Sequence, residues 1–172
     1  MIFNFPKWKL NCLVALLFAI IVCDIHSQSS SSIDVKIIKT SDLELIVEEA
    51  KGSALFINVW ATWCAPCREE FPELVKLSDE YKSEMKFIGI SADEIEDLND
   101  KVIPFLKKQN ARFQNYLINV SDPENFINAL NKDWSGALPA TFIYDKAGAQ
   151  MKMLIGKQSY EQFEQAIKKV VN

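Results

Sequence analysis

Apolar residues recur along the chain in two patterns, and together these patterns predict a mixed α/β domain. The runs at 54–60 and 85–91 are apolar almost throughout, which is typical of parallel strands that are covered on both faces. A turn at 145–148 separates the last two strands and indicates a hairpin, so these two are expected to pair antiparallel. The predicted strands lie at 35–39, 54–60, 85–91, 116–120, 140–144 and 150–155.

Helical spacing of apolar residues predicts helices between these strands. Ser41 and Ser159 each begin a capping box, with Glu or Gln three residues later, and so predict the beginnings of the first and the last helix. A short helix is expected to begin at Pro123. The acidic run at 93–100 is interpreted as the solvated beginning of a helix, without a role in function. The expected architecture is a mixed sheet with helices on both faces.

The strand at 54–60 leads directly into Trp63-Cys64-Ala65-Pro66-Cys67, and an amphipathic helix follows. Two cysteines three positions apart in a first helical turn have Cα atoms roughly 5 Å apart, a separation that a disulfide can span. Pro66 fits this turn because its missing N–H would have had no helical partner. We therefore expect a disulfide between Cys64 and Cys67 that opens and closes without refolding.

The two cysteines are predicted to have different roles. Unpaired N–H groups and the macrodipole at a helix N-terminus stabilise negative charge, so they favour the thiolate of Cys64. Cys64 is therefore the predicted nucleophile. Cys67 lies one turn further into the helix, where it can attack the mixed disulfide that Cys64 forms with a partner protein.

Three other interpretations of the C-x-x-C are open. A purely structural disulfide would add little, because so small a ring contributes about 2 kcal/mol, against about 3 for a fifteen-residue loop. A zinc site would need two more ligands, and Cys12, Cys23 and His26 all lie in the apolar N-terminal region. Chance is disfavoured by the strand before the motif and the helix after it. No metal and no cofactor are expected.

The N-terminus is typical of a signal peptide over residues 1–27. Two lysines precede an apolar stretch at 10–23, which is shorter than the roughly 20 residues that span a bilayer. Ser27 is an acceptable small residue before cleavage at Gln28. Retention of the segment as a membrane anchor and lipid attachment at Cys23 are the alternatives.

The length and composition of the chain predict a single domain, and its cysteine content predicts an oxidising compartment. The chain has 172 residues, 49% of them hydrophobic, which suits one domain with a core. Residues 28–32 are a serine-rich, flexible lead-in, and the domain is expected at 33–172. Beyond residue 27 the only cysteines are Cys64 and Cys67 and there is no histidine, which excludes histidine-dependent catalysis. Disulfides persist in exported proteins, so thiol exchange has substrates there.

Charge argues against nucleic acid as a partner. Loss of residues 1–27 removes two lysines and one aspartate, which changes the net charge from −4 to −5. The sequence contains no basic patch of the kind that nucleic-acid binding requires. We therefore expect protein partners.

Three stretches resemble motifs of exported thioredoxin-like proteins of the TlpA/ResA type. They are Trp63 to Cys67, the Glu70-Phe71-Pro72 that follows, and Leu138-Pro139-Ala140-Thr141-Phe142. The resemblance covers residues 33–172 and is specific at these motifs. It implies a thioredoxin fold, in the α/β class, with an inserted strand and helix at 116–130 before the proline strand.

The resemblance also assigns proton handling to Glu70. Ordinary thioredoxins carry a buried aspartate six residues before the first cysteine, whereas this chain has Asn58 there, which cannot take a proton. TlpA/ResA-type relatives carry an active-site glutamate at the position of Glu70, one helical turn past Cys67. The alternative is a surface carboxylate without a role, which is the expectation for the neighbouring Glu69.

The predicted substrate-binding residues are Trp63, Leu138 and Pro139. Pro139 resembles the cis-proline that faces the disulfide in this fold, beside a backbone edge that can pair with a substrate strand. A trans proline that begins a strand is the alternative. Trp63 can place an apolar ring beside the sulfur atoms. Trp60 and Trp134 are expected to be packing residues.

The activity that the resemblance implies is thiol-disulfide exchange in the periplasm. The protein is expected to reduce disulfides of other exported proteins, with cytochrome c maturation as the associated process. It is expected to act as a monomer and to be kept reduced by a membrane electron donor. The alternatives are a peptide-binding module with an idle disulfide and a disulfide oxidase. A reductant is favoured because Ala65 and Pro66 offer no side-chain donor to a thiolate.

Overall fold

The computed structural model describes residues 33–171. The predicted signal peptide and the lead-in at 28–32 lie outside the described residues, so both stay predictions. Strands begin and end close to the expected positions. They are β1 (Val35–Ile38), β2 (Ala54–Trp60), β3 (Met85–Ser91), β4 (Gln114–Ile118), β5 (Ala140–Tyr144) and β6 (Gln150–Ile155).

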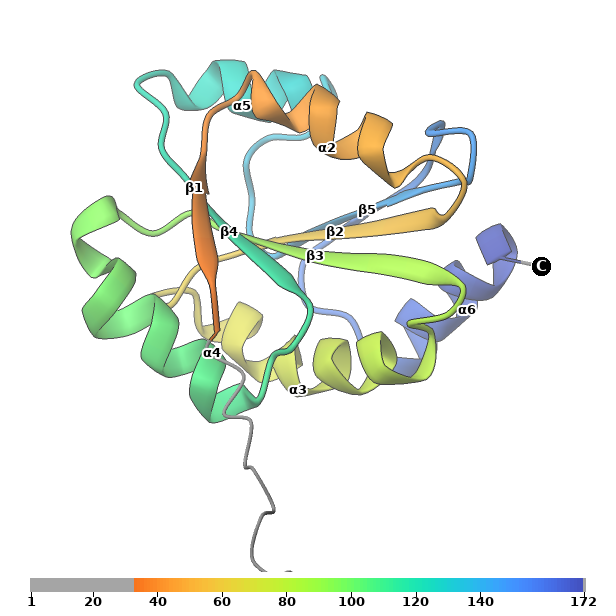
Figure 1. Ribbon diagram of the computed structural model, residues 1–172, viewed down its shortest axis with the longest axis horizontal. Helices are drawn as coiled ribbons and strands as arrows, with labels where there is room; N and C mark the ends of the chain where they lie inside the picture. The colour runs from red at the N-terminus through yellow and green to blue at the C-terminus, as the bar shows by residue number, and fades with distance from the viewer. Residues whose placement is uncertain (1–32, 172) are drawn as a thin grey trace, which may run out of the picture. The chain divides into compact units, whose positions relative to one another are not determined.

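One six-stranded sheet has the order β1-β4-β3-β2-β5-β6 (Figure 1). The pairs β1–β4, β4–β3 and β3–β2 are parallel, whereas β5 pairs antiparallel with both β2 and β6. Every residue of β2 is buried, which is why its sequence is apolar almost throughout. The sheet is therefore mixed, as predicted.

Helices cover both faces of this sheet. They are α2 (Asp42–Ala50), α3 (Ala65–Glu80), α4 (Ile103–Gln109), α5 (Pro123–Leu130) and α6 (Tyr160–Val171). Figure 1 shows α2 and α5 on one face and α3, α4 and α6 on the other. β4 and α5 are the inserted strand and helix that the resemblance implies, and β4 lies inside the sheet between β1 and β3.

Each face of the sheet has its own apolar core. Aromatic rings fill the core under α3 and α6, where Phe56 stacks on Phe87 with 4.8 Å between ring centroids. Trp60 meets Phe71 of α3 edge to face at the same distance. The core under α2 and α5 is mainly aliphatic, with Ile57 as one of its fully buried members. Trp134 packs in this second core, as expected for a structural tryptophan.

Three expectations are corrected by the structure. The strand expected at 116–120 is β4, which begins two residues earlier, because its register with β3 begins at the pair Ile88 and Gln114. Ser41 precedes α2 without a side-chain cap bond, since its own backbone is already helical (φ −61°, ψ −21°). The Asp42 carboxylate accepts a hydrogen bond from Lys39 N instead.

The third correction concerns the acidic run at 93–100, which is not a solvated helix beginning throughout. It contains a 3₁₀ turn, η1 (Ile95–Asp97), and the first part of a π-helical turn, η2 (Leu98–Val102), and α4 begins only after both. Its first residue, Asp93, is 3% exposed. A buried carboxylate needs hydrogen-bond partners, and those of Asp93 lie beside the C-x-x-C.

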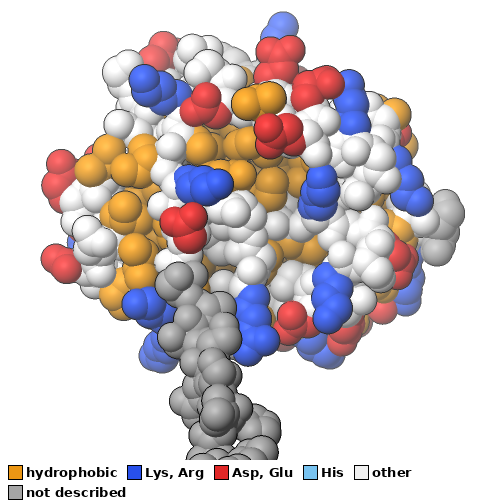
Figure 2. Space-filling model, in the orientation of Figure 1, with side chains coloured by type: hydrophobic (Ala, Val, Ile, Leu, Met, Phe, Trp, Pro, Cys, Tyr) orange, Lys and Arg blue, Asp and Glu red, His pale blue; other side chains and the backbone are white. Residues whose placement is uncertain are grey.

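On the face shown in Figure 2, Lys and Arg side chains alternate with Asp and Glu and form no continuous basic patch. No helix within the described part of the chain is both long and apolar enough to cross a membrane.

Candidate active site

The C-x-x-C lies where the chain passes from β2 into α3. Cys64 N donates a hydrogen bond to Ala61 O (3.2 Å), which closes a tight turn after the strand. Cys64 is the N-cap of α3, with extended backbone, and its sulfur accepts a hydrogen bond from Cys67 N (3.3 Å). Pro66 stands in the first turn of the helix, as predicted. The sulfur of Cys64 therefore sits at the positive end of the helix.

Cys64 and Cys67 form a disulfide, with Cα atoms 5.3 Å apart. Cys64 is 6% exposed and Cys67 1% exposed, so the order of exposure is the predicted one. Neither sulfur is open to solvent to any large extent. A substrate must therefore approach Cys64 along the surface around the turn.

Glu70 is buried behind this disulfide, at 1% exposure. One carboxylate oxygen accepts a hydrogen bond from Asn58 Nδ2 (3.0 Å), and the other accepts one from Gln158 N (2.9 Å). Burial raises the pKa of Glu70 to about 7, although the bonds from Gln158 and Asn58 oppose the shift. A carboxyl group with this pKa exchanges a proton readily at neutral pH.

Asn58 connects Glu70 to the proline strand. Its amide nitrogen also donates to Thr141 Oγ1 of β5 (3.0 Å), two residues after Pro139. Asn58 Oδ1 is buried without a hydrogen-bond partner. If the amide group exchanged its two ends, this oxygen would accept a hydrogen bond from the O–H of a protonated Glu70. Asn58 can thus form a hydrogen bond with either protonation state of Glu70, although its own amide group does not titrate.

Glu69, the neighbour of Glu70, points to solvent. Its carboxylate pairs with Lys157 Nζ at 2.8 Å, and both side chains are more than half exposed. The hydrogen bond from Lys157 lowers the pKa of Glu69. The two adjacent glutamates therefore differ in burial and in the direction of their pKa shifts.

The Leu138–Pro139 peptide bond is cis, as predicted. Trp63, the residue before the nucleophile, is 65% exposed, while Leu138 is partly buried against the core. Both residues line a cavity of about 420 Å³. Its other walls include Ile95 and Ile127, and Glu94 is among its acidic residues. Two of the three predicted substrate-binding residues, Trp63 and Leu138, therefore line a shared groove that is apolar with acidic side chains, and Pro139 follows Leu138 in the chain without lining it.

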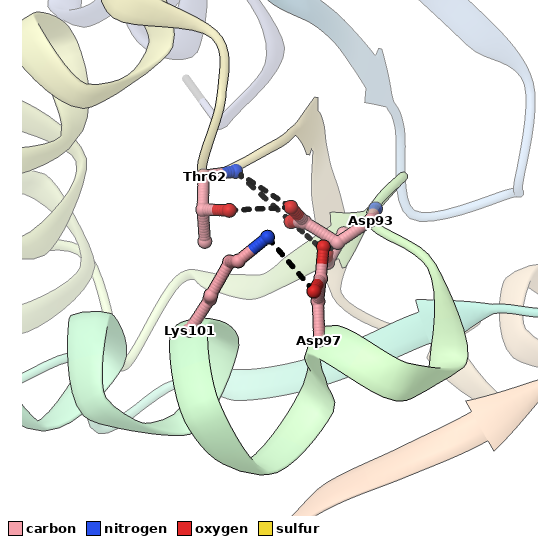
Figure 3. Close-up of polar contacts among 5 residues, drawn as sticks. Thr62, Asp93, Asp97 and Lys101 are labelled. Carbon is pink, nitrogen blue, oxygen red and sulfur yellow. Dashed lines mark hydrogen bonds and ion pairs between the residues drawn. The ribbon is translucent and has the colours of Figure 1, made fainter.

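Asp93 is a site residue that the sequence interpretation missed. Its carboxylate accepts hydrogen bonds from Thr62 N (2.9 Å), from the Thr62 hydroxyl and from the Ser91 hydroxyl (2.6 Å) (Figure 3). A signal was available in the sequence. Asp93 follows the buried strand β3 almost directly, and the carboxyl ends of parallel strands meet at one edge of a sheet, where the C-x-x-C also lies.

Within residues 33–171, no group of three or more His, Cys, Asp or Glu side chains is arranged to hold a metal ion. Cys12, Cys23 and His26, the remaining candidates for zinc, lie outside the described residues.

A C-x-x-C disulfide at a helix N-terminus and a cis-proline, on a mixed sheet with helices on both faces, define a thioredoxin-like thiol-disulfide oxidoreductase. The chain belongs to the AhpC/TSA family, whose model matches residues 30–149. It is 31% identical over 134 residues to the thiol-disulfide oxidoreductase ResA of Bacillus cereus. The aligned region covers 76% of this chain and 72% of that relative.

Two further comparisons agree with this family. The thioredoxin-like protein YneN of Bacillus subtilis is 28% identical over 122 residues, which is 70% of this chain and 67% of the relative. A thiol:disulfide interchange protein of the thioredoxin family from Chlorobium tepidum has a similar structure, with a TM-score of 0.61 and 28% identity. The match covers 73% of this chain and 84% of that one.

Proposed function

We propose that this thiol-disulfide oxidoreductase is exported and reduces disulfides of other exported proteins. The observation that carries the proposal is the Cys64–Cys67 disulfide at the N-terminus of α3, with the buried Glu70 carboxyl group behind it. Strongly shifted pKa values are concentrated at functional sites, and burial raises the pKa of Glu70 to about 7. The combination therefore supports a redox-active disulfide rather than a purely structural one.

The reaction proceeds in two exchange steps. The Cys64 thiolate of the reduced protein attacks one sulfur of the substrate disulfide, and the other substrate sulfur leaves as a thiolate that takes up a proton. Cys67, as a thiolate, then attacks the Cys64 sulfur of the mixed disulfide and releases the second substrate thiol. Two electrons pass to the substrate, and the Cys64–Cys67 disulfide forms.

Glu70 is the proposed acceptor of the proton that Cys67 must lose. It follows Cys67 by three residues on α3, so the two side chains emerge from the same face of the helix. With a pKa of about 7 the carboxyl group is partly ionised at neutral pH, so it can accept this proton and release it later. No histidine is present beyond residue 26 to compete for that task.

Substrates are proposed to bind in the groove that Trp63 and Leu138 line, next to the cis-proline Pro139. The exposed Trp63 ring offers apolar contact area next to the nucleophile. Glu94 and Glu96 line the groove and no Lys or Arg does, so a substrate segment with an apolar side chain and a basic residue is complementary to it.

The compartment and the partners follow from the same chemistry. Export to the periplasm is supported by the pattern of the N-terminal 27 residues and by a domain whose only two cysteines are joined. We also propose that the protein acts there as a monomer. A membrane electron donor would return the pair to the dithiol. Cytochrome c maturation is the process to test first, because the TlpA/ResA resemblance points there.

Trapping of the mixed disulfide tests the proposal. A Cys67→Ser variant cannot resolve the intermediate, so it should accumulate substrates on Cys64 when expressed with its N-terminal segment. The captured proteins are identified after release with a reductant. A Cys64→Ser variant is the matched control and should capture none of them.

Two outcomes would contradict the proposal. Equal capture by both variants would indicate a peptide-binding module with an idle disulfide, because binding alone does not require the nucleophile. Oxidation of dithiol substrates by the Cys64–Cys67 disulfide of the parent protein, without reduction of disulfide substrates by its dithiol form, would indicate an oxidase.

A further inference from the structure

Asp93 ties the turn before the nucleophile to the end of β3. Its carboxylate accepts from both the backbone and the side chain of Thr62, two residues before Cys64, and from the hydroxyl of Ser91. Asp93 N donates in return to the Ser91 hydroxyl (3.1 Å). We call Thr62, Ser91 and Asp93 the clasp. All three hydrogen bonds reach one carboxylate that is 3% exposed, and Figure 3 shows the two from Thr62.

The clasp supplies a hydrogen-bond partner for the backbone of the turn, beyond the point where the sheet's own hydrogen bonds end. The last backbone hydrogen bond where β2 and β3 end runs from Ala92 N to Trp60 O (2.8 Å). The turn that follows is closed by the hydrogen bond from Cys64 N to Ala61 O. Thr62 N is left over between these two, and Asp93 accepts its hydrogen bond. The clasp therefore determines where the chain leaves β2 and where Cys64 enters α3.

The disulfide restrains the same segment from the other side. In the oxidised protein the covalent link to Cys67 holds Cys64 in place. Once this link opens, Cys64 is held by the turn bond to Ala61 and, through Thr62, by the clasp. Preorganisation of two reacting groups raises their effective concentration toward each other.

We propose that Asp93 is a positioning residue that holds Cys64 close to Cys67 in the reduced enzyme and thereby sets the redox potential of the pair. The proposal rests on the thiol-disulfide activity proposed above. Asp93 acts through Thr62 and touches neither sulfur in the exchange. Because the clasp and the disulfide restrain the same turn, each makes the other more favourable.

The equilibrium with glutathione measures this coupling. The Cys64–Cys67 disulfide and two glutathione thiols exchange to give the protein dithiol and one glutathione disulfide, with two electrons transferred and thiols conserved. Loosening the turn lowers the effective concentration of Cys64 and Cys67, so the protein disulfide forms less readily. The potential should then become less negative.

Asp93→Asn and Thr62→Val test the proposal in the full domain. We expect Asp93→Asn to weaken the protein disulfide about tenfold against glutathione, which is a shift of about 30 mV toward oxidising values. Thr62→Val should shift it in the same direction by a smaller factor, since the Thr62 N–H remains. Thr62→Ser keeps both donors and should match the parent protein.

Thr62→Val also separates geometry from charge. Removing the Asp93 charge could favour the Cys64 thiolate directly, which would shift the potential in the same direction. Thr62→Val leaves that charge in place, so a shift there requires the clasp. Asp97→Asn is the matched control, because it removes a nearby charge whose ion pair with Lys101 (2.9 Å) is partly exposed and includes no bond to Thr62.

A merely structural role gives a different result. If Asp93 only stabilised the fold, its replacement would lower the unfolding free energy of the oxidised and reduced forms equally and leave the potential unchanged. Unchanged potentials in both Asp93→Asn and Thr62→Val would overturn the inference, and Thr62→Val decides it alone if Asp93→Asn does not fold. A parent protein that fails to equilibrate with glutathione would instead refute the proposed function.

Discussion

At the scale of single residues, the site depends on a carboxyl group that is closed to solvent. Glu70 is buried with two hydrogen-bond donors, Asn58 Nδ2 and Gln158 N, and the loss of solvation outweighs both of them. A pKa of about 7 follows from that balance. The group therefore changes its charge in the pH range where thiol exchange takes place.

Replacement of Glu70 should change how thiol reactivity depends on pH. We expect Glu70→Gln to remove an inflection near pH 7 from the alkylation rates of the reduced cysteines, because glutamine does not titrate. The measurement is the rate of iodoacetamide labelling between pH 5 and 9. Glu69→Gln is the control and should leave the profile unchanged, and identical profiles in all three proteins would remove Glu70 from the mechanism.

The raised pKa of Glu70 also predicts how the stability of the fold depends on pH. Because the folded pKa of Glu70 is raised above 4.5, the folded protein holds this proton more tightly than the unfolded chain. The contribution of Glu70 is therefore fully present below pH 4.5 and is lost as the pH rises to about 7. Glu70→Gln should gain stability relative to the parent over that interval, as urea titrations at several pH values would show. A constant difference between the two proteins would contradict the raised pKa.

The two cysteines should differ in reactivity after reduction. Cys64 caps the helix and is the more exposed sulfur, so limiting alkylating reagent is expected to label it first. Peptide mapping of the labelled protein gives the answer. Label found mainly on Cys67 would reverse the roles assigned to the pair.

At the scale of elements, the two helices expected to begin with capping boxes differ. Ser159 Oγ accepts from Gln162 N (3.3 Å), and the Gln162 side chain accepts from Ser159 N (2.8 Å), so the box before α6 is formed. Ser41 makes no such bond before α2. The same sequence pattern therefore has different energetic value at the two positions.

Alanine at these two serines should show this difference. We expect Ser159→Ala to lower the unfolding free energy by about 1 kcal/mol, the usual cost of a lost N-cap. Ser41→Ala should change it by less than about 0.5 kcal/mol. Chemical denaturation of the oxidised proteins measures both values, and an equal loss at the two positions would contradict the observed bonding.

At the scale of the whole molecule, the direction of electron flow depends on how strongly the fold stabilises the thiolate. Ala65 and Pro66 lie between the cysteines and donate no side-chain hydrogen bond to sulfur. The helix N-terminus is the remaining source of stabilisation. The buried Glu70, when ionised, opposes a second negative charge nearby.

The pair should therefore be moderately reducing. We expect its potential to lie nearer to the value of about −270 mV for thioredoxin than to about −120 mV for DsbA. Equilibration of the purified domain with defined glutathione ratios measures it. A value close to that of DsbA would replace the reductase proposal with an oxidase.

Local patterns in the sequence determined much of this protein. Apolar runs and helical spacing predicted the strands and helices, because burial on one or both faces leaves a period that a single element records. The C-x-x-C between a strand and a helix predicted the Cys64–Cys67 disulfide, since three helical positions bring two cysteines within bonding distance. These features depend on neighbours in the chain.

Contacts between distant segments were decided only by the tertiary structure. Glu70 is buried and accepts a hydrogen bond from Gln158 N, 88 residues later, whereas Glu69 points toward Lys157 and solvent. Asp93 reaches Thr62 across 31 residues because β2 and β3 are adjacent and end at the same edge. Burial and pKa depend on what packs against a side chain, so neighbouring glutamates and an acidic run look alike until the sheet brings their partners into place.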